Sequence, residues 1–228
     1  PHCAEQAICA IILIMLRNNL DVKILSVVMV VLFIGFGAIT IIQIDKESKD
    51  MLEQNQIKVN LLATSIEKSI QNYMMEGRVD LIRRLLADIK NSKEVERLEI
   101  IKRDGKLAFT DFTTVEKVQK KREEFKFVKE REKPANFLDG NDPFLSYYFK
   151  GIFETGKNIS YYERDEGREL LTLLQPLINQ RECQRCHGAD HNIRGILRIS
   201  TSMKGVNEAI RSNRNRVIII SLITIILV

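Results

Sequence analysis

Residues 97–109 read RLEIIKRDGKLAF, and this stretch decides which class of fold the chain adopts. Apolar residues lie on both sides of Asp104-Gly105. Asp-Gly readily occupies a two-residue hairpin turn, because both residues adopt positive φ angles at little cost. The segment therefore predicts a β-hairpin over Leu98–Thr110.

Two further stretches predict strands of the same sheet. Ile159–Tyr162 and Glu169–Leu174 flank another turn, Asp165-Glu166-Gly167, and predict a second hairpin. The apolar run Ile193–Thr201 predicts one more strand. Because hairpins join antiparallel neighbours, these strands predict an antiparallel sheet.

Helical patterns lie before and after these strands. Apolar residues recur at helical spacing through Asp45–Glu76, which predicts a long amphipathic helix that breaks at Gly77. A second such pattern covers Val79–Ile89, and a last one begins at Val206. The order of elements predicts an α+β domain with helices on one side of the sheet.

The segment between the two hairpins has two distinct compositions. Residues 115–133 are rich in Lys, Arg and Glu, which is typical of a solvated surface helix or a mobile segment. Asn136–Gly151 contains five aromatic residues, which either cover an apolar pocket or belong to the core.

An uncharged run, ILSVVMVVLFIGFGAITIIQI, occupies residues 24–44. At about 1.5 Å per residue, a helix of this length crosses a hydrocarbon core of about 30 Å. The alternative, a buried core helix, is disfavoured by the length of the run. Arg17 and Lys23 precede it, and because positive residues tend to stay in the cytoplasm, the chain after Asp45 is expected outside.

The ends of the chain carry further expectations. The apolar run Val217–Val228 is too short to span a membrane and is interpreted as a truncated second transmembrane helix. Arg211, Arg214 and Arg216 before it conflict with the positive-inside rule unless they reach lipid headgroups. Residues 1–14 are interpreted as read-through upstream of a natural start at Met15. The expected organisation is a cytoplasmic segment 1–23, a transmembrane helix 24–44, an external domain 45–216 and the start of a second transmembrane helix 217–228.

Composition narrows the classes of partner. The chain of 228 residues has 35 Lys and Arg against 30 Asp and Glu, no Trp, and no basic patch interleaved with aromatic residues. This argues against a nucleic-acid partner. The four cysteines, Cys3, Cys9, Cys183 and Cys186, do not form a disulfide framework.

One motif carries chemistry. Arg181-Glu-Cys183-Gln-Arg-Cys186-His187-Gly188 contains C-x-x-C-H, the attachment pattern of c-type haem. Two thiols at this spacing reach the two vinyl groups on one edge of a porphyrin, and the next residue places an imidazole under the iron. Gly188 relieves crowding after that ligand. The motif predicts one covalent haem c bound by Cys183, Cys186 and His187.

Three other interpretations of the motif are open. Cys183, Cys186, His187 and His191 could ligate zinc, although structural zinc sites usually separate their ligand pairs by a dozen or so residues. A thioredoxin-like redox pair requires a βαβ context that the sequence does not show. A chance match is disfavoured because the motif lies on the predicted outer side, where c-type haem is assembled.

The distal ligand of the iron has four candidates. His191 follows His187 too closely to reach the opposite haem face, and Met203 is better explained by packing near the membrane. Met74 lies on the apolar stripe of the first helix, so core packing and iron ligation are both open for it. Met75 points to another face of that helix.

Around the motif, the sequence resembles the periplasmic haem-c PAS-like sensor domains of bacterial chemoreceptors and sensor histidine kinases. The resemblance covers most of Asp45–Val228. It rests on the first membrane helix, Tyr73-Met-Met-Glu-Gly-Arg78, the hairpin Leu98–Thr110, Leu174-Gln-Pro-Leu-Ile-Asn179 leading into Cys183–Gly188, Arg194-Gly-Ile-Leu-Arg-Ile-Ser200, and the second membrane helix.

The resemblance implies a PAS- or Cache-like fold, a homodimer, and a place in the inner membrane with the main domain in the periplasm. It also implies that a Met of the first helix is the distal ligand and exchanges with water, and Met74 matches that position best. The chain has no HAMP, kinase, cyclase or methyl-accepting region, so an output region is expected beyond Val228.

These observations predict a non-enzymatic sensor of redox state or of a diatomic gas. Exchange of Met74 at the iron for water or NO would shift the first helix and pass a conformational change across the membrane. The alternative is a membrane-anchored monohaem cytochrome that meets a redox partner, against which a second membrane helix argues. A haem peroxidase is disfavoured because no distal His/Arg pair can be assigned.

Overall fold

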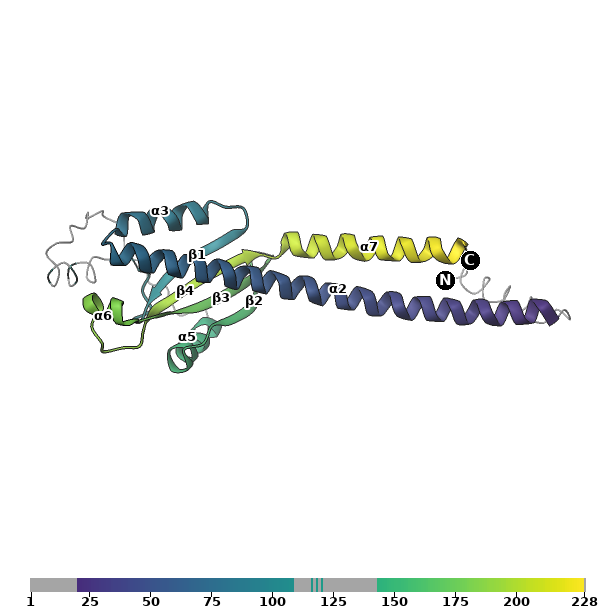
Figure 1. The fold of residues 1–228 in the computed structure, drawn as a ribbon, viewed down its shortest axis with the longest axis horizontal. Coiled ribbons are helices and arrows are strands. Elements are labelled where there is room, and N and C mark those ends of the chain that lie inside the picture. Colours follow the sequence, from purple (N-terminus) through teal and green to yellow (C-terminus); the bar gives the residue numbers. More distant parts are fainter. Residues whose placement is uncertain (1–19, 109–115, 117, 119, 121–142, 228) are drawn as a thin grey trace. The chain divides into compact units, whose positions relative to one another are not determined.

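The computed structural model describes residues 20–108, 116, 118, 120 and 143–227 (Figure 1). The chain forms two compact units, one of Pro1–Leu52 with Asn207–Val228 and one of Glu53–Val206. The elements are, in chain order, α2 Leu20–Met75, α3 Val79–Lys90, β1 Val95–Lys102, α5 Pro143–Thr155, β2 Ile159–Asp165, β3 Arg168–Ile178, α6 Arg181–His187, β4 Ile193–Ser202 and α7 Lys204–Leu227.

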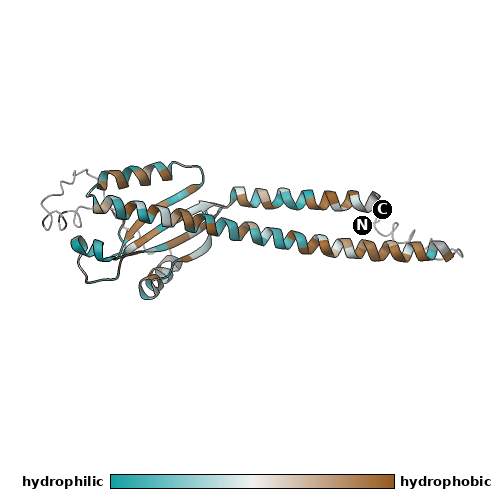
Figure 2. Cartoon of the chain, in the orientation of Figure 1, coloured by the Kyte–Doolittle hydropathy of each residue, from teal (hydrophilic) through white to brown (hydrophobic). Residues whose placement is uncertain are grey.

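The first unit contains the apolar part of α2. Lys23–Met75 is long and apolar enough to cross a membrane by its length and composition, and no other helix within the described ranges meets that test. The first half of α2 is apolar nearly all round (Figure 2), which is typical of a helix surrounded by lipid. The second predicted membrane segment is the end of α7, and this second span stays a prediction.

Polar side chains join α2 to α7 within this unit. The hydroxyls of Thr40 and Ser221 lie 2.8 Å apart and share a hydrogen bond. Asn213 donates a second hydrogen bond to the carboxylate of Glu47. These two contacts align the stretch of α2 that precedes Leu52 with the part of α7 that follows Asn207.

The second unit is built on a four-stranded antiparallel sheet with the order β1-β4-β3-β2. The α+β class is therefore confirmed. β4 is an inner strand that pairs with β3, the preceding strand, and with β1, from a distant part of the sequence. Eight of its first nine residues are buried, as expected for a strand with neighbours on both edges.

The hairpin predicted around Asp165-Glu166-Gly167 is confirmed. Asp165 pairs with Arg168, so the loop has only Glu166 and Gly167, with φ angles of 47° and 80°. Positive φ at both positions is the signature of a type I′ turn, whose twist matches that of the strands it joins.

The hairpin predicted over Leu98–Thr110 forms over its described residues. Gly105 has φ 80°, and the Lys102 amide donates to the Lys106 carbonyl at 2.7 Å. The second arm pairs with β1 through the bridge between Ile101 and Leu107 and through the Ala108 amide, which donates to the Ile100 carbonyl at 2.7 Å, and its last two residues lie outside the described ranges. β1 also pairs, over its whole length, with β4.

A glycine allows β1 and β4 to approach closely. Gly195 pairs with Lys102, and a Cβ atom at Gly195 would lie 2.5 Å from the backbone oxygen of Ile101. No real side chain fits at that distance. The register of the two strands at this end of the sheet therefore depends on glycine.

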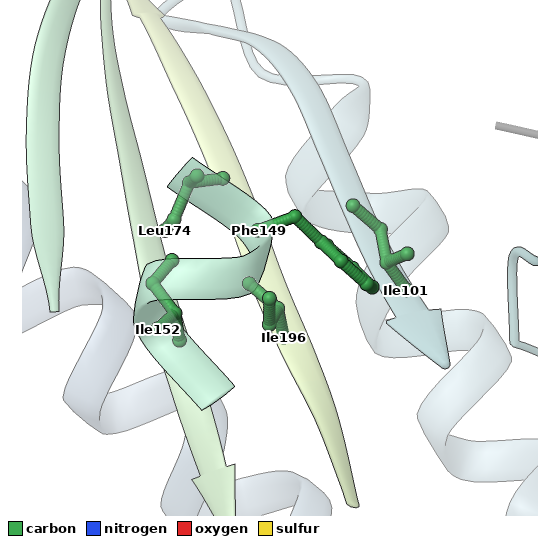
Figure 3. Close-up of a cluster of buried hydrophobic side chains, with 5 residues drawn as sticks. All are labelled: Ile101, Phe149, Ile152, Leu174 and Ile196. Atoms are coloured by element: carbon green, nitrogen blue, oxygen red, sulfur yellow. The ribbon is translucent and has the colours of Figure 1, made fainter. Parts of the chain in front are cut away.

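Helices cover both faces of the sheet, which corrects the prediction of a one-sided layer. Ile152 and Phe149 of α5 pack on Leu174, Ile196 and Ile101 (Figure 3). Gln175, the next residue of β3, donates instead to the carboxylate of Glu67 on α2. Because successive strand residues point to opposite faces, α5 and α2 lie on opposite sides.

Phe149, Tyr148 and Phe153 of α5 lie in the core or pack against it, whereas Tyr147 is exposed. Phe149 is 9% exposed within the cluster of Figure 3. Tyr148 stacks on Tyr161 of β2, with ring centroids 5.0 Å apart. Phe137 and nearly all of 115–133 lie outside the described ranges, so the surface-helix or mobile-segment interpretation is not addressed.

The predicted break at Gly77 is confirmed. α2 ends at Met75, and Gly77 has φ 73°. The Arg78 amide donates to the Tyr73 carbonyl at 2.8 Å and the Gly77 amide to that of Met74 at 3.1 Å, the paired bonds of a helix that ends on glycine. α3 then begins at Val79, as the apolar pattern predicts.

Candidate functional site

The C-x-x-C-H motif lies on α6, a seven-residue helix that follows β3. Cys183 and Cys186 are three residues apart and His187 is four residues after Cys183, so all three occupy neighbouring positions on one side of the helix. Both cysteines are half-buried and neither is in a disulfide. The helix thus presents two thiols and an imidazole together.

Gly188 ends the helix directly after His187. Its φ and ψ angles are 81° and 170°, and its amide donates to the Gln184 carbonyl at 2.9 Å. This positive φ is poorly accessible to residues with a side chain. A Cβ atom here would also lie 3.2 Å from a carboxylate oxygen of Asp190. The chain therefore turns away immediately after the imidazole.

Asn179, two residues before α6, is a functional residue that the sequence did not indicate. Asn179 is 4% exposed, and its side-chain nitrogen donates to the carbonyls of Gly188 and His191, each at 2.8 Å. Asparagine after a strand is an ordinary loop residue, so no sequence signal distinguishes it. Through these hydrogen bonds, Asn179 connects the chain before the motif to the chain after it.

His191 and Asp190 form the outer part of this segment. The Nε2 atom of His191 lies 3.3 Å from a carboxylate oxygen of Asp190, and Arg194 contacts the other oxygen at 3.2 Å. The pKa of Asp190 lies below its usual value, first because a backbone N–H donates to the carboxylate and then because His191 and Arg194 supply positive charge. His191 lies here as a surface residue.

The two alternative chemistries gain no support from the geometry. Within the described ranges, no three His, Cys, Asp or Glu side chains gather closely enough to hold a metal ion, so the zinc ligand set is not assembled. The described sheet is antiparallel throughout, so α6 is not part of the βαβ unit that a thioredoxin-like site requires.

Met203 lies at the wrong end of the sheet to reach the motif. It directly follows β4, whereas the motif precedes that strand. Ten residues at about 3.3 Å each place the two ends of the strand about 30 Å apart. Met203 is 2% exposed and its sulfur is 3.3 Å from the side-chain nitrogen of Asn55. The packing interpretation of Met203 accounts for these contacts.

Met74 lies at the same end of the sheet as the motif. Contacts along α2 define its direction: Asn55 meets Met203, and Glu67 meets Gln175, near the end of β3 that leads into α6. Met74 is two turns beyond Glu67, about 10 Å further along the helix. Figure 1 shows α6 and the end of α2 at one end of the sheet unit. Met74 is half-buried, whereas Met75 is 41% exposed.

A second polar cluster lies on the α5 face of the sheet. Arg198, whose side chain is 3% exposed, contacts Glu163 at 3.1 Å and Glu99 at 3.7 Å. Thr172 donates to Glu163 at 2.6 Å and shares a hydrogen bond of 2.7 Å with Ser200. The Glu163 carboxylate on β2 thus joins residues of β3 and β4.

Residues 114–204 match the family model for a methyl-accepting chemotaxis sensory transducer, class 40H, sensor. The match is to the sensor part of a chemoreceptor. The matched range includes α6 and its motif. Together with the apolar helix, it indicates a membrane-associated receptor with a sensory role in signal transduction, and it fits a non-enzymatic sensor portion. The resemblance to chemoreceptor sensor domains is thus supported, and the haem stays a prediction.

Comparison with solved structures gives a distant likeness. The chain is similar to the domain of a sensory box/GGDEF family protein from Vibrio parahaemolyticus, with 14% identity and a TM-score of 0.38. The similarity covers 72% of this chain and 58% of the other, so the chain spans little more than half of that structure. No curated protein matches the chain.

Proposed function

We propose that this chain is the extracytoplasmic haem-c sensor portion of a transmembrane signal-transduction receptor. Cys183 and Cys186 would form the two thioether bonds, and His187 would be the proximal ligand of the iron. The main observation behind this proposal is that the three residues occupy neighbouring positions on one side of α6. The match of residues 114–204 to a chemoreceptor sensor model supports the sensory part of the proposal.

The donor set fits the group. Thiols three residues apart on a helix point in similar directions, as two bonds to one porphyrin edge require. Gly188 turns the chain away from the imidazole, and the half-buried positions of Cys183, Cys186 and His187 leave each side chain partly accessible for attachment. When bound, haem c supplies an iron centre that responds to redox potential and to diatomic gases.

Met74 is the residue proposed for the distal position. It lies in the last turn of α2, at the end of the sheet that carries α6. A sulfur ligand from α2 would couple the ligation state to this helix, whose earlier residues form the apolar segment. The other end of α2's contact with the sheet is Asn55, which holds Met203 between β4 and α7. α2 therefore contacts the residue from which α7 begins, as well as carrying Met74.

The periplasmic location and the homodimer remain part of the proposal. The uncharged segment 24–44 and the positive residues before it support an outward orientation for Glu53–Val206. Attachment of haem c on that side would be consistent with this orientation. A membrane-anchored electron-carrying cytochrome has the same motif, and the experiments below separate the two functions.

The first experiment tests the cofactor. The full chain is produced together with the cytochrome c maturation machinery, and its pyridine haemochrome spectrum is recorded beside that of a Cys183→Ser/Cys186→Ser control. We expect c-type bands that survive acid–acetone extraction in the wild-type chain and are lost in the control. Their absence from the wild-type chain would refute the cofactor assignment.

The second experiment tests sensing against electron transfer. NO and CO binding to the reduced chain is compared in wild type, Met74→Ala and Met75→Ala. We expect Met74→Ala to change the spectrum of the reduced protein and to speed gas binding, while Met75→Ala leaves both unchanged. An iron that binds neither gas, with rapid electron exchange with small cytochromes, would favour the electron carrier.

A further inference from the structure

Asn179 joins the sheet to the segment that carries the motif. It lies between the end of β3 at Ile178 and the start of α6 at Arg181. A side chain only 4% exposed at this position is unusual, because residues that connect elements are mostly solvated. Its burial therefore suggests that the side chain holds part of the structure in place.

The hydrogen bonds of Asn179 hold the chain that leaves the motif. Its side-chain nitrogen donates to the carbonyls of Gly188 and His191, and its backbone amide donates to the carbonyl of Asn192, all at 2.8 Å. All three acceptors follow His187. Since Asn179 itself precedes α6, one residue ties together the entrance and the exit of the motif segment.

The middle of the motif reaches the same residue. Gln184, which stands between the two cysteines, donates from its side chain to the backbone carbonyl of Asn179 at 3.1 Å. Every hydrogen bond of Asn179 among the described residues thus runs to the segment 184–192. Its side chain contributes to the geometry of this segment, while its backbone amide extends the pairing of β3 with β4 by one step.

The side-chain oxygen of Asn179 has a different status from the nitrogen. It is buried and accepts no hydrogen bond from any described residue. A histidine that coordinates iron through one ring nitrogen carries an N–H on the other, and such groups are regularly held by an acceptor close by. A buried, unused acceptor next to the motif is chemically suited to this need.

We propose that Asn179 is a positioning residue for His187. By fixing the backbone on both sides of α6, it sets the orientation in which the imidazole meets the iron. Groups that orient a metal ligand tune the metal centre as well as holding the ligand. This inference rests on the proposed function, since it assigns the orientation of an axial ligand.

The test compares two variants with a matched control in the full, haem-loaded chain. Asn179→Asp keeps the shape of the side chain but removes both donors, and Asn179→Ala removes the whole group. Thr172→Val is the control, because Thr172 is also fully buried and loses comparable side-chain hydrogen bonds on β3, away from α6. Haem content, midpoint potential, the low-spin EPR spectrum and the melting temperature are measured for all four proteins.

We expect both Asn179 variants to retain c-type bands while their midpoint potential and EPR g-values shift from wild type. Thr172→Val should lower the melting temperature without moving either signal. Loss of attachment in Asn179→Asp at an unchanged melting temperature would also support positioning. Wild-type potential and EPR spectrum in both Asn179 variants, or an equal shift in Thr172→Val, would overturn the inference alone. A wild-type chain without haem would instead overturn the proposed function, and this inference with it.

Discussion

The sulfur of Met203 lies 3.3 Å from the side-chain nitrogen of Asn55, although the two residues are 148 positions apart in the chain. Met203 is the one residue between the end of β4 and the start of α7, and Asn55 belongs to α2. The contact therefore joins α2 to the single residue that links β4 to α7.

Truncation of Met203 tests this junction. Met203 is 2% exposed, so Met203→Ala removes buried apolar atoms and leaves a cavity. We expect the free energy of unfolding of the sheet unit to fall by about 2–4 kcal/mol, measured by urea denaturation. Met75→Ala is the control, because this side chain is 41% exposed and should change stability by less than about 0.5 kcal/mol. Equal effects of the two substitutions would contradict the buried junction.

The Glu163–Arg198 cluster makes a second prediction. Arg198→Ala leaves Glu163 and Glu99 without the buried cation that they contact. Removing one partner of a buried ion pair typically costs about 3–5 kcal/mol, and we expect a loss of that size in urea denaturation.

Arg164→Ala is the matched comparison for the cluster. Arg164 contacts Glu169 at 2.9 Å, but both side chains are at least half exposed. Exposed pairs contribute about 0–1 kcal/mol, so this variant should unfold nearly as the wild type does. A large loss in Arg164→Ala, or none in Arg198→Ala, would show that burial does not set the strength of these contacts.

Gly195→Ala should disturb the sheet where β1 meets β4. The new Cβ atom would lie 2.5 Å from the Ile101 carbonyl oxygen, so the two strands must separate. We expect a loss of about 1–3 kcal/mol together with faster amide exchange at the end of β1. Gly151→Ala in α5 provides the opposite control: nothing lies within 4 Å of its Cβ position, and alanine favours the helix by about 0.5–1 kcal/mol.

The pH dependence of the loop after α6 follows from Asp190. Its pKa is lowered from 3.8 in the folded chain, so the charged carboxylate stabilises the loop at neutral pH. That contribution is present above the unfolded pKa and is lost as the pH falls through the lower, folded value. An NMR titration should place the Asp190 midpoint below 3.8, and Asp190→Asn should remove the acid-dependent change in loop amide exchange. A midpoint above the ordinary value would contradict this assignment.

The features that the sequence predicted correctly are local ones. The β2–β3 hairpin follows from two residues, Glu166 and Gly167, that accept positive φ between apolar runs. The end of α2 follows in the same way from Gly77. In both cases the signal and the structure that it specifies lie within a few residues of each other.

Features that depend on distant partners were missed or misjudged. The arm after Gly105 pairs with β1 as expected, but the sequence did not indicate that β4, nearly a hundred positions away, is the second partner of β1. The side of the sheet that α5 covers depends on which alternate residues of β3 and β4 are apolar on each face. Likewise, Cys183, Cys186 and His187 could be chosen from their spacing, whereas Asn179 could not, since its importance arises only from the carbonyls that surround it.

The inner position of β4 has a consequence for synthesis. In the four-stranded sheet that the structure describes, β4 lies between β1 and β3, and it pairs along nearly the whole of β3. Its residues, 193–202, follow the two thiols of α6 in the chain. Cys183 and Cys186 are therefore synthesised before β4, and β1 cannot be joined to β3 in the sheet until β4 has been made. During translation, the two cysteines of the motif are thus present before the sheet of the domain can be completed.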